Sequence, residues 1–201
     1  MAGGRKLEFD KQKALEAAMH VFWKKGYSGA SLADLTESMG INKPSLYATF
    51  GNKEALFIQA TEFYLEKVAK THCQFLTQED VALRDRLKNY LMSVVASQCD
   101  SSKPKGCYIA LCASEAAGET IPDDAQETLF KAGDYTQNAL MKVFTDDPDA
   151  VHLLSKTGSS AEEAVRFLFT LLNGTATMAR AGLSLIELES VIDHALKGIG
   201  L

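Results

Sequence analysis

Apolar residues recur at helical spacing along almost the whole chain, and no stretch keeps the alternating pattern of a β-strand for long. Ala14, Ala18 and Phe22 lie four residues apart and fall on one face of a first helix. Asp10 can cap this helix and Gly26 can end it. The same periodicity predicts further helices over residues 53–76, 80–98, 106–118, 123–145, 161–181 and 184–198. We therefore expect an all-α protein.

Two short helices with clear end signals follow the first one. Ser31 and Asp34 have the spacing of a capping box, and Gly40 can end the helix that they begin. Asn42 can cap the next helix, with Pro44 in its first turn, where a missing N–H costs no hydrogen bond. Two short helices joined by a tight turn and braced by a longer helix make a helix-turn-helix arrangement. We expect these three helices to form an N-terminal domain, followed by a C-terminal helical bundle.

Charge is distributed unevenly between this N-terminal part and the rest of the chain. The 201 residues are 46% apolar, enough to bury a sizeable core, and carry a net charge of −5. Residues 1–55 hold 8 cations and 6 anions, whereas the remaining 146 residues hold 13 cations and 20 anions. A mildly basic N-terminal part on an acidic body favours an anionic partner for the N-terminal part alone.

The third helix leaves its polar residues on the outer faces. Leu46 and Phe50 lie four residues apart and occupy the inner face. The outward side chains that can bind DNA are Lys43, Ser45, Tyr47 and Thr49. A lysine offers a cation to phosphate or guanine, and hydroxyl groups can bind phosphates or base edges. Lys53, at the start of the next helix, adds a cation beside free backbone N–H groups. The alternative is an ordinary short helix of a bundle.

A dense set of motifs in residues 9–57 carries a family resemblance. The motifs are the framework Phe22, Gly26 and Tyr27, the helix start Ser31–Leu35, the Gly40 turn, Ser45-Leu46-Tyr47 and Phe50-Gly51-Asn52-Lys53-Glu54. With these motifs, the region resembles the N-terminal domain of the TetR family of bacterial transcriptional repressors. The resemblance implies a DNA-binding helix-turn-helix domain over residues 1–52 and a ligand-sensing and dimerisation domain over residues 53–201.

The resemblance also implies roles for individual residues. It implies that residues 43–49 read DNA, that Tyr47 and Lys53 contact phosphates, and that Ser31 supports them from the N-terminus of its helix. Many relatives carry bulky aromatic residues or His where this chain has Ala48 and Thr49. The side chains left for base readout are then Lys43, Ser45 and Thr49.

A homodimer on a palindromic double-stranded DNA operator is the assembly that the resemblance implies. One short recognition helix gives too small an interface for tight specific binding, whereas a two-fold dimer reads two half-sites. The last two helices offer apolar residues for the interface, and those we expect there are Leu168, Leu172, Leu188 and Ile192. Apolar residues of these helices can equally belong to the core of the same chain, and the sequence leaves both roles open.

Residues 103–115 suggest a sensing role. If a helix starts near Gly106, Cys107 lies in its first turn, where unpaired N–H groups, Lys103 and Lys105 favour a thiolate. The segment resembles the Gly-Cys start of the sixth helix in TetR regulators that respond to electrophiles or oxidants. The open alternative is a small, buried and inert cysteine. We therefore hypothesise a ligand- or redox-responsive regulator that an effector releases from its operator.

Other candidates for an effector pocket are polar or aromatic residues on helices that line the pocket in this family. They are Tyr90, Tyr108, Glu115, Phe130, Phe169, Asn173 and Met178. Glu115 and Asn173 are the most informative, because a polar group on a mostly apolar face must find a partner.

Several other classes of protein and site are disfavoured. The four cysteines form no CxxC pair, so we expect free thiols. The four histidines lie too far apart to indicate a metal site. The chain lacks a glycine-rich phosphate loop, an HExxH motif and a Ser-His-Asp pattern, so we expect neither an enzyme nor a cofactor. The rival hypotheses are a thiol oxidoreductase that uses Cys107 and an interaction module that has lost DNA binding.

The sequence also predicts where the protein acts. No apolar run approaches the roughly 20 residues that span a bilayer, and the first residues contain no apolar secretion signal. We therefore expect a cytoplasmic protein without a membrane partner.

Overall fold

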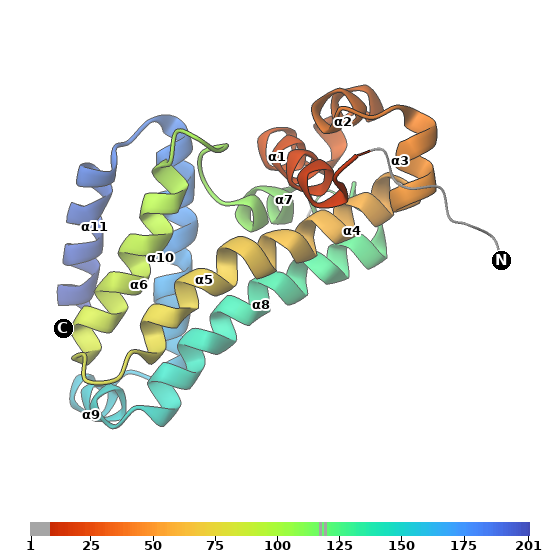
Figure 1. Cartoon of the computed structure of the whole chain (residues 1–201). Helices are drawn as coiled ribbons and strands as arrows, with labels where there is room; N and C mark the ends of the chain where they lie inside the picture. Colours follow the sequence, from red (N-terminus) through yellow and green to blue (C-terminus); the bar gives the residue numbers. More distant parts are fainter. Residues whose placement is uncertain (1–8, 117, 119) are drawn as a thin grey trace.

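The computed structural model describes residues 9–116, 118 and 120–201. Within these residues every regular element is helical, which confirms the predicted all-α fold (Figure 1). The α-helices are α1 (Lys11–Gly29), α2 (Leu32–Met39), α3 (Lys43–Phe50), α4 (Lys53–Tyr64), α5 (Lys70–Cys73), α6 (Leu83–Cys99), α7 (Tyr108–Ala116), α8 (Asp123–Asp146), α9 (Pro148–Thr157), α10 (Ala161–Ala181) and α11 (Leu185–Gly198). We call residues 9–52 the head and residues 53–201 the body.

The first helix of the head begins and breaks where the sequence predicts. The Asp10 carboxylate accepts hydrogen bonds from the N–H groups of Gln12 and Lys13, at 2.9 and 3.3 Å. Gly26 has φ +73°, a backbone conformation that favours glycine and interrupts the helix. One further helical turn then runs on to Gly29.

The two short helices of the head are fixed by local side-chain caps. Ser31 and Asp34 form the predicted capping box, and Gly40 ends α2 in the left-handed conformation with φ +65°. The Asn42 side-chain oxygen accepts a hydrogen bond from the Ser45 N–H at 2.9 Å and so starts α3. These contacts lie within a few residues of one another, which is why the sequence alone predicts the helix-turn-helix.

Aromatic side chains join the head to the body in one continuous core. Phe22 of α1 meets Phe57 of α4 edge to face, with ring centroids 5.1 Å apart. Trp23 meets Tyr64 in the same way at 5.2 Å, and Tyr64 stacks on Tyr108 of α7 at 5.1 Å. The head therefore packs on α4 and α7 through buried aromatic side chains.

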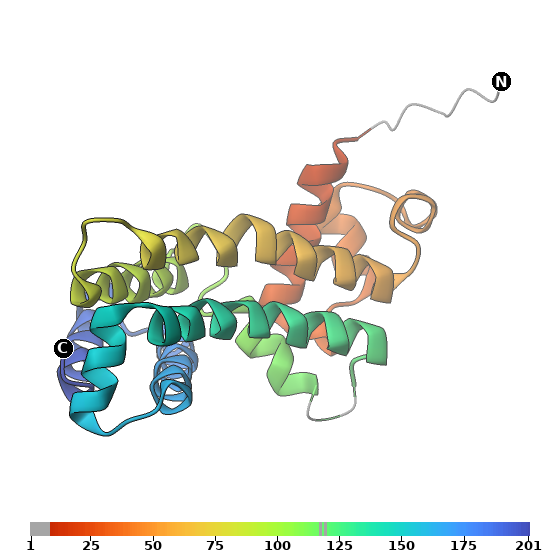
Figure 2. The same ribbon diagram turned by 90° about the horizontal axis from the view of Figure 1, so that it is seen from below.

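The helix predicted over residues 53–76 is a nearly continuous rod from Lys53 to Thr77. It consists of α4, a π-helical segment Leu65–Ala69, α5 and a 3-10 turn Gln74–Thr77. In both views the rod lies beside α8 and connects the head to the far end of the body (Figures 1 and 2). π-helical segments are often found at functional sites.

A second core lies at the far end of the body, between α6, α8, α10 and α11. One helix there, α9, is not predicted, because residues 146–160 fall between two expected helices. Its end signals are nonetheless present. The Asp147 carboxylate accepts from the N–H groups of Asp149 and Ala150, Pro148 occupies the first turn, and Gly158 ends the helix with φ +71°.

Among the described residues, no helix is both long enough and apolar enough to cross a membrane. Nor do these residues gather three or more His, Cys, Asp or Glu side chains in a group that could hold a metal ion.

Candidate nucleic-acid interface and effector cavity

The outer face of α3 presents an exposed stripe that is suited to a duplex. Lys43, Tyr47 and Ala48 are exposed, and 47% of the Tyr47 surface is accessible. Leu46 and Phe50 are buried against the head core, as their spacing predicts. The stripe therefore combines a cation and a phenolic hydroxyl with a residue small enough to allow close approach.

Other predicted DNA-binding hydroxyl and cationic groups are less free than the sequence suggests. Ser45 and Thr49 are half-buried at the flank of α3 and not on its outermost face. The Ser31 hydroxyl already bonds Asp34 Oδ2 at 2.8 Å within the capping box. Lys53 is half-buried, with its Nζ 4.4 Å from the centroid of the Tyr27 ring. To reach a phosphate, Lys53 must turn away from this ring.

One lysine of the head forms an ion pair with a carboxylate of α2. Lys25 Nζ lies 2.6 Å from Asp34 Oδ1. This lysine, together with the Ser31 hydroxyl and N–H, lowers the pKa of Asp34 to about 2. Lys25 is therefore paired with an ionised carboxylate, whereas Lys43 is an exposed cation within the stripe itself.

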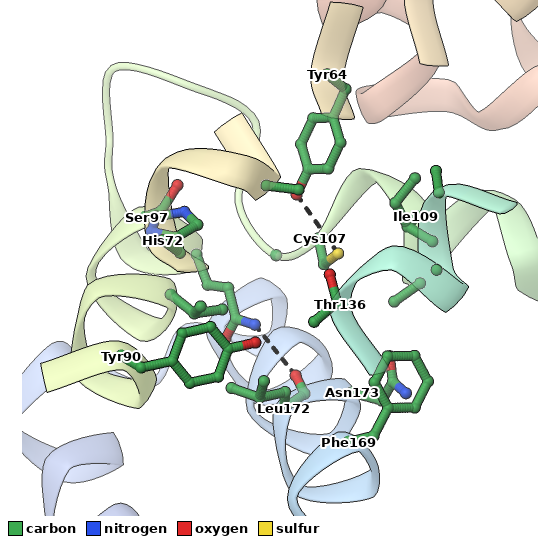
Figure 3. A pocket seen from close by; sticks show the side chains of 17 residues that line it. Tyr64, His72, Tyr90, Ser97, Cys107, Ile109, Thr136, Phe169, Leu172 and Asn173 are labelled. Carbon is green, nitrogen blue, oxygen red and sulfur yellow. Dashed lines mark hydrogen bonds between the residues drawn. The ribbon is translucent and has the colours of Figure 1, made fainter. Parts of the chain in front are cut away.

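A cavity of about 70 Å³ lies in the body between the α4–α5 rod, α6, α7, α8 and α10 (Figure 3). The residues that line it are Tyr64, Ala69, His72, Tyr90, Val94, Ser97, Gln98, Gly106, Cys107, Ile109, Ala110, Ala132, Gly133, Thr136, Phe169, Leu172 and Asn173. Four predicted pocket residues are therefore brought together: Tyr90, Cys107, Phe169 and Asn173. His72 and Gln98 also line the cavity but are not predicted from the sequence, since a single polar residue in an amphipathic helix carries no signal that it faces a cavity.

The other predicted pocket residues do not line this cavity. Tyr108 is buried in the core of the head, where its hydroxyl shares a hydrogen bond with Thr61 at 2.8 Å. Glu115 is half-buried where the body contacts the head, and its carboxylate accepts a hydrogen bond from Ser28. Phe130 and Met178 are exposed, with 48% and 43% of their surfaces accessible. Tertiary contacts, which leave no trace in the local sequence, decide these positions.

Cys107 lies in the cavity wall but not in the first turn of a helix. The helix α7 begins at Tyr108, so Cys107 precedes it, and its carbonyl accepts the N–H of Leu111 at 3.1 Å. The Sγ atom lies 3.6 Å from the Tyr64 hydroxyl (Figure 3). Burial raises the pKa of Tyr64, and the nearby Cys107 raises it further. The phenol therefore keeps its proton and can donate it to the sulfur in a hydrogen bond.

The other cysteines have different surroundings. All four are free thiols, as expected. Cys112 is buried in the core, and burial raises the pKa of its thiol. Cys99 points to the Leu183 carbonyl at 3.9 Å, and Cys73 to the Ala69 carbonyl at 3.7 Å. Cys107 is therefore the cysteine that lines the cavity.

Two polar contacts cross from the body to the α1 end of the head. Glu115 Oε2 accepts the Ser28 N–H at 3.1 Å. Arg180 of α10 donates from Nη1 to the Trp23 carbonyl at 3.3 Å and to the Lys105 carbonyl at 3.5 Å. Lys105 and Gly106 immediately precede Cys107, so the same arginine contacts the head and the segment that carries the cavity thiol.

The expected dimer residues Leu168, Leu172, Leu188 and Ile192 are buried inside the single chain, with at most 6% of their surfaces accessible. They belong to the core between α6, α8, α10 and α11, so they are not available to a partner. The exposed apolar residues on the outer faces of the last two helices are Phe167, Met178, Leu185, Ile186 and Val191. Both helices are apolar, as expected. Each has one apolar face buried in the core of the chain and further apolar residues exposed on its outer face.

A capped helix-turn-helix with an exposed polar stripe, carried on a helical body with an internal cavity, defines a DNA-binding protein of the helix-turn-helix class. Comparison with known proteins gives the family. Residues 14–60 match the model of the bacterial regulatory proteins of the tetR family. The transcriptional repressor ComR of Escherichia coli strain K12 is 29% identical over 194 residues, which are 96% of this chain and 90% of ComR.

Solved structures agree with this match. A cysteine-substituted form of CifR, a TetR family transcriptional regulator complexed with 26-bp double-strand operator DNA, is 31% identical. The alignment covers 96% of this chain and 98% of that chain, with a TM-score of 0.82. The reduced form of E. coli NemR has the same fold, with a TM-score of 0.72 at 17% identity over 92% of this chain and 93% of that chain.

The chain belongs to the TetR family of bacterial transcriptional regulators. It is therefore a DNA-binding regulator and not an enzyme.

Proposed function

We propose that this protein is a repressor that binds a palindromic operator as a homodimer and leaves it when an effector acts on the body. The exposed Lys43–Tyr47 stripe of α3, held in place by two capped helices, carries this proposal. Relatives named as repressors, such as ComR, and the operator complex of CifR support it. Its partner is chromosomal DNA, so we place the protein in the cytoplasm.

The two parts of the chain divide this work. Residues 1–52 bind DNA. Tyr47 and Lys53, which lies at the domain boundary, contact phosphates. Lys43, Ser45 and Thr49 lie nearest to the bases. Residues 53–201 sense the effector and dimerise. Phe57 of α4 packs on Phe22 of the head, so the body also completes the core of the head. This shared core is a rigid connection through which a change in the body moves the recognition helix.

Cys107 is the proposed point at which an electrophile or oxidant acts. Its Sγ lines the cavity beside the Tyr64 hydroxyl, and α7 starts at the next residue. The far end of α7 carries Glu115, which bonds Ser28 of the head. Because α7 begins at the residue after Cys107, a group added to Sγ displaces α7, and the contact with the head shifts with it.

The effector can only weaken operator binding by as much as it prefers the form that does not bind DNA. Maleimide gives a defined test of this preference. Its alkene carbon bonds to Cys107 Sγ, the carbon–carbon π bond breaks, and the thiol proton ends on the neighbouring ring carbon. The adduct therefore adds bulk at one atom without an added oxidant.

The test is a fluorescence anisotropy titration of labelled DNA from the regions flanking the protein's own gene. We expect tight, specific binding by the untreated protein and binding weakened about tenfold or more after N-ethylmaleimide. Cys107→Ser should bind the same DNA and keep its affinity after treatment, whereas the control Cys99→Ser should respond like the wild type. The sensing role is wrong if Cys107→Ser still responds, and the repressor role is wrong if none of the flanking DNA is bound specifically.

A further inference from the structure

Two residues that line the cavity each carry a buried polar atom with no hydrogen-bond partner among the described residues. These atoms are the hydroxyl oxygen of Tyr90 and the Oε1 atom of Gln98. Only 1% of the Tyr90 surface and 3% of the Gln98 surface are accessible. An unpaired buried polar atom destabilises the fold, and most such atoms in proteins are paired. Both atoms therefore indicate a partner inside the cavity.

The hydrogen-bonding role of each atom is defined by its surroundings. Gln98 Nε2 donates to the Leu172 carbonyl at 3.1 Å, which fixes the amide and leaves Oε1 as an acceptor (Figure 3). Burial raises the pKa of Tyr90, so its phenol stays protonated and can both donate and accept. In Figure 3 the Tyr90 hydroxyl points toward the hydrogen bond that ends on Leu172. The partner must supply a donor for Gln98 and a group that bonds the Tyr90 hydroxyl.

The electrostatics of the cavity disfavour a charged ligand. Among the described residues that line it there is no Lys, Arg, Asp or Glu. His72 lines it too, but burial lowers its pKa to about 4, so its ring is neutral at pH 7. The His72 Nδ1 atom already pairs with Ser93 Oγ at 2.7 Å. An ion placed here would lose its solvation without gaining a counter-charge.

The size and the remaining lining limit the rest of the ligand. A cavity of about 70 Å³ holds roughly five to seven water-sized groups, since one such group needs about 10–15 Å³. Apolar side chains make up much of the wall, among them Val94, Ile109, Phe169 and Leu172. A compact apolar body therefore fits beside the two polar atoms.

We propose that this cavity binds a small, uncharged alcohol, whose hydroxyl donates to Gln98 Oε1 and accepts from the Tyr90 hydroxyl. A hydroxyl is the smallest group that both donates and accepts, so it supplies the two roles that these atoms require. A ketone of the same shape only accepts and leaves Gln98 Oε1 unpaired. This proposal names the ligand class of the effector cavity, so its regulatory meaning rests on the function proposed above.

Binding of four matched probes to the full-length protein without DNA tests the ligand class. The probes are cyclopentanol, cyclopentanone, cyclopentanecarboxylate and cyclopentylammonium, and ligand-detected NMR gives their dissociation constants. We expect cyclopentanol to bind about tenfold more tightly than cyclopentanone, and the two ions not to bind. Equal binding of the alcohol and the ketone overturns the proposal. So does the absence of any binding, which would mean that only water occupies the cavity.

Two variants assign the binding to the proposed atoms. Tyr90→Phe should weaken cyclopentanol binding about tenfold and leave the unfolding midpoint of the free protein unchanged or higher, because the lost hydroxyl has no partner. Gln98→Met should bring cyclopentanol down to the affinity of cyclopentanone and leave cyclopentanone unchanged. Tyr135→Phe, an exposed tyrosine of α8 outside the cavity, is the matched control. Unchanged cyclopentanol affinity in Tyr90→Phe overturns the proposal.

Anisotropy with operator DNA separates this proposal from the proposed function. If cyclopentanol binds as predicted and lowers operator affinity, the proposed ligand class and the proposed function both stand. If it binds through Tyr90 and Gln98 without any effect on operator affinity, the ligand class stands and the role of the cavity in release fails. If N-ethylmaleimide releases the operator while no alcohol binds, the proposed function stands and the ligand class fails.

Discussion

The Glu115 carboxylate accepts a hydrogen bond from the backbone N–H of Ser28 at 3.1 Å, although 87 residues separate them in the chain. Glu115 lies near the end of α7, the helix that starts immediately after the cavity cysteine Cys107. Ser28 lies near the end of α1, on which the short helix α2 packs. This bond is therefore a direct polar contact between the helix beside the cavity and the head.

We expect Glu115→Ala to reduce the effect of the cavity on DNA binding. The Ser28 N–H is exposed and can bind water, so the fold should lose only about 1 kcal/mol. The change in operator affinity on N-ethylmaleimide treatment should fall about fivefold relative to the wild type, measured by anisotropy. Glu127→Ala, at an exposed position on α8, is the control. A full response in Glu115→Ala would show that the coupling runs through other contacts.

Gly26 is required at this joint for two separable reasons. Its φ of +73° disfavours side chains, and a Cβ atom there would lie 1.7 Å from Glu115 Oε1. Gly40 has a similar φ of +65°, but a Cβ atom added to it would have no other atom within 4 Å. We expect Gly26→Ala to lower the free energy of unfolding by about 2 kcal/mol and Gly40→Ala by about 1 kcal/mol, because the Glu115 carboxylate can turn away from the new Cβ atom only by losing its bond to Ser28. Urea denaturation measures both, and equal losses would mean that the approach of Glu115 has no cost.

The sequence predicts those features that depend on neighbouring residues. Ser31 and Asn42 are recognisable as caps because each bonds an N–H three residues away. Helix α9 shows the limit of such signals. Asp147, Pro148 and Gly158 mark its ends, but the helix between them is too short for its apolar spacing to stand out.

The sequence cannot predict features that depend on long-range packing. Leu168 and Phe167 are adjacent in α10, yet Leu168 is buried in the core and 44% of the Phe167 surface is accessible. The periodicity of the sequence shows that both faces of the helix are apolar. It does not show which face is buried in the chain and which can contact a partner. The sequence predicts a partner for Glu115, because it is a polar residue on a mostly apolar face. Its partner is the Ser28 N–H group of the head and not a residue of the cavity. The identity of that partner depends on how α7 packs against α1.

Different residues of the DNA-binding surface should affect different properties. Tyr47→Ala and Lys53→Ala should weaken binding to all DNA sequences, and the lysine change should reduce the slope of log affinity against log salt by about 1. Lys43→Ala and Ser45→Ala should instead alter the preferred operator sequence. Anisotropy on a panel of operator variants at several salt concentrations measures both effects. Lys156→Ala, exposed on α9, is the control, and equal binding by every variant would exclude α3 as the reading helix.

The exposed apolar faces of α10 and α11 are where we expect the homodimer interface. Val191 of α11 has 40% of its surface accessible, and Val151 of α9 has a similar 47%. Val191→Lys should place a charge in the interface and dissociate the dimer, whereas Val151→Lys should leave it intact. Analytical ultracentrifugation gives the oligomeric state of each variant. A dimer that survives Val191→Lys at micromolar concentration would place the interface on another surface.

His72 should make the stability of the protein depend on pH. Burial lowers the pKa of His72 to about 4, below its ordinary value of 6.5, so the unfolded chain binds the proton first as the pH falls. The stability from a neutral His72 is therefore fully present above pH 6.5 and is lost progressively down to about pH 4. The loss should amount to about 2 kcal/mol after allowance for partial exposure. His72→Asn lacks this titration, so its unfolding free energy, measured with urea from about pH 4 to 7.5, should fall less with acid than that of the wild type. Parallel curves for the two proteins would show that His72 is protonated without cost in the folded state.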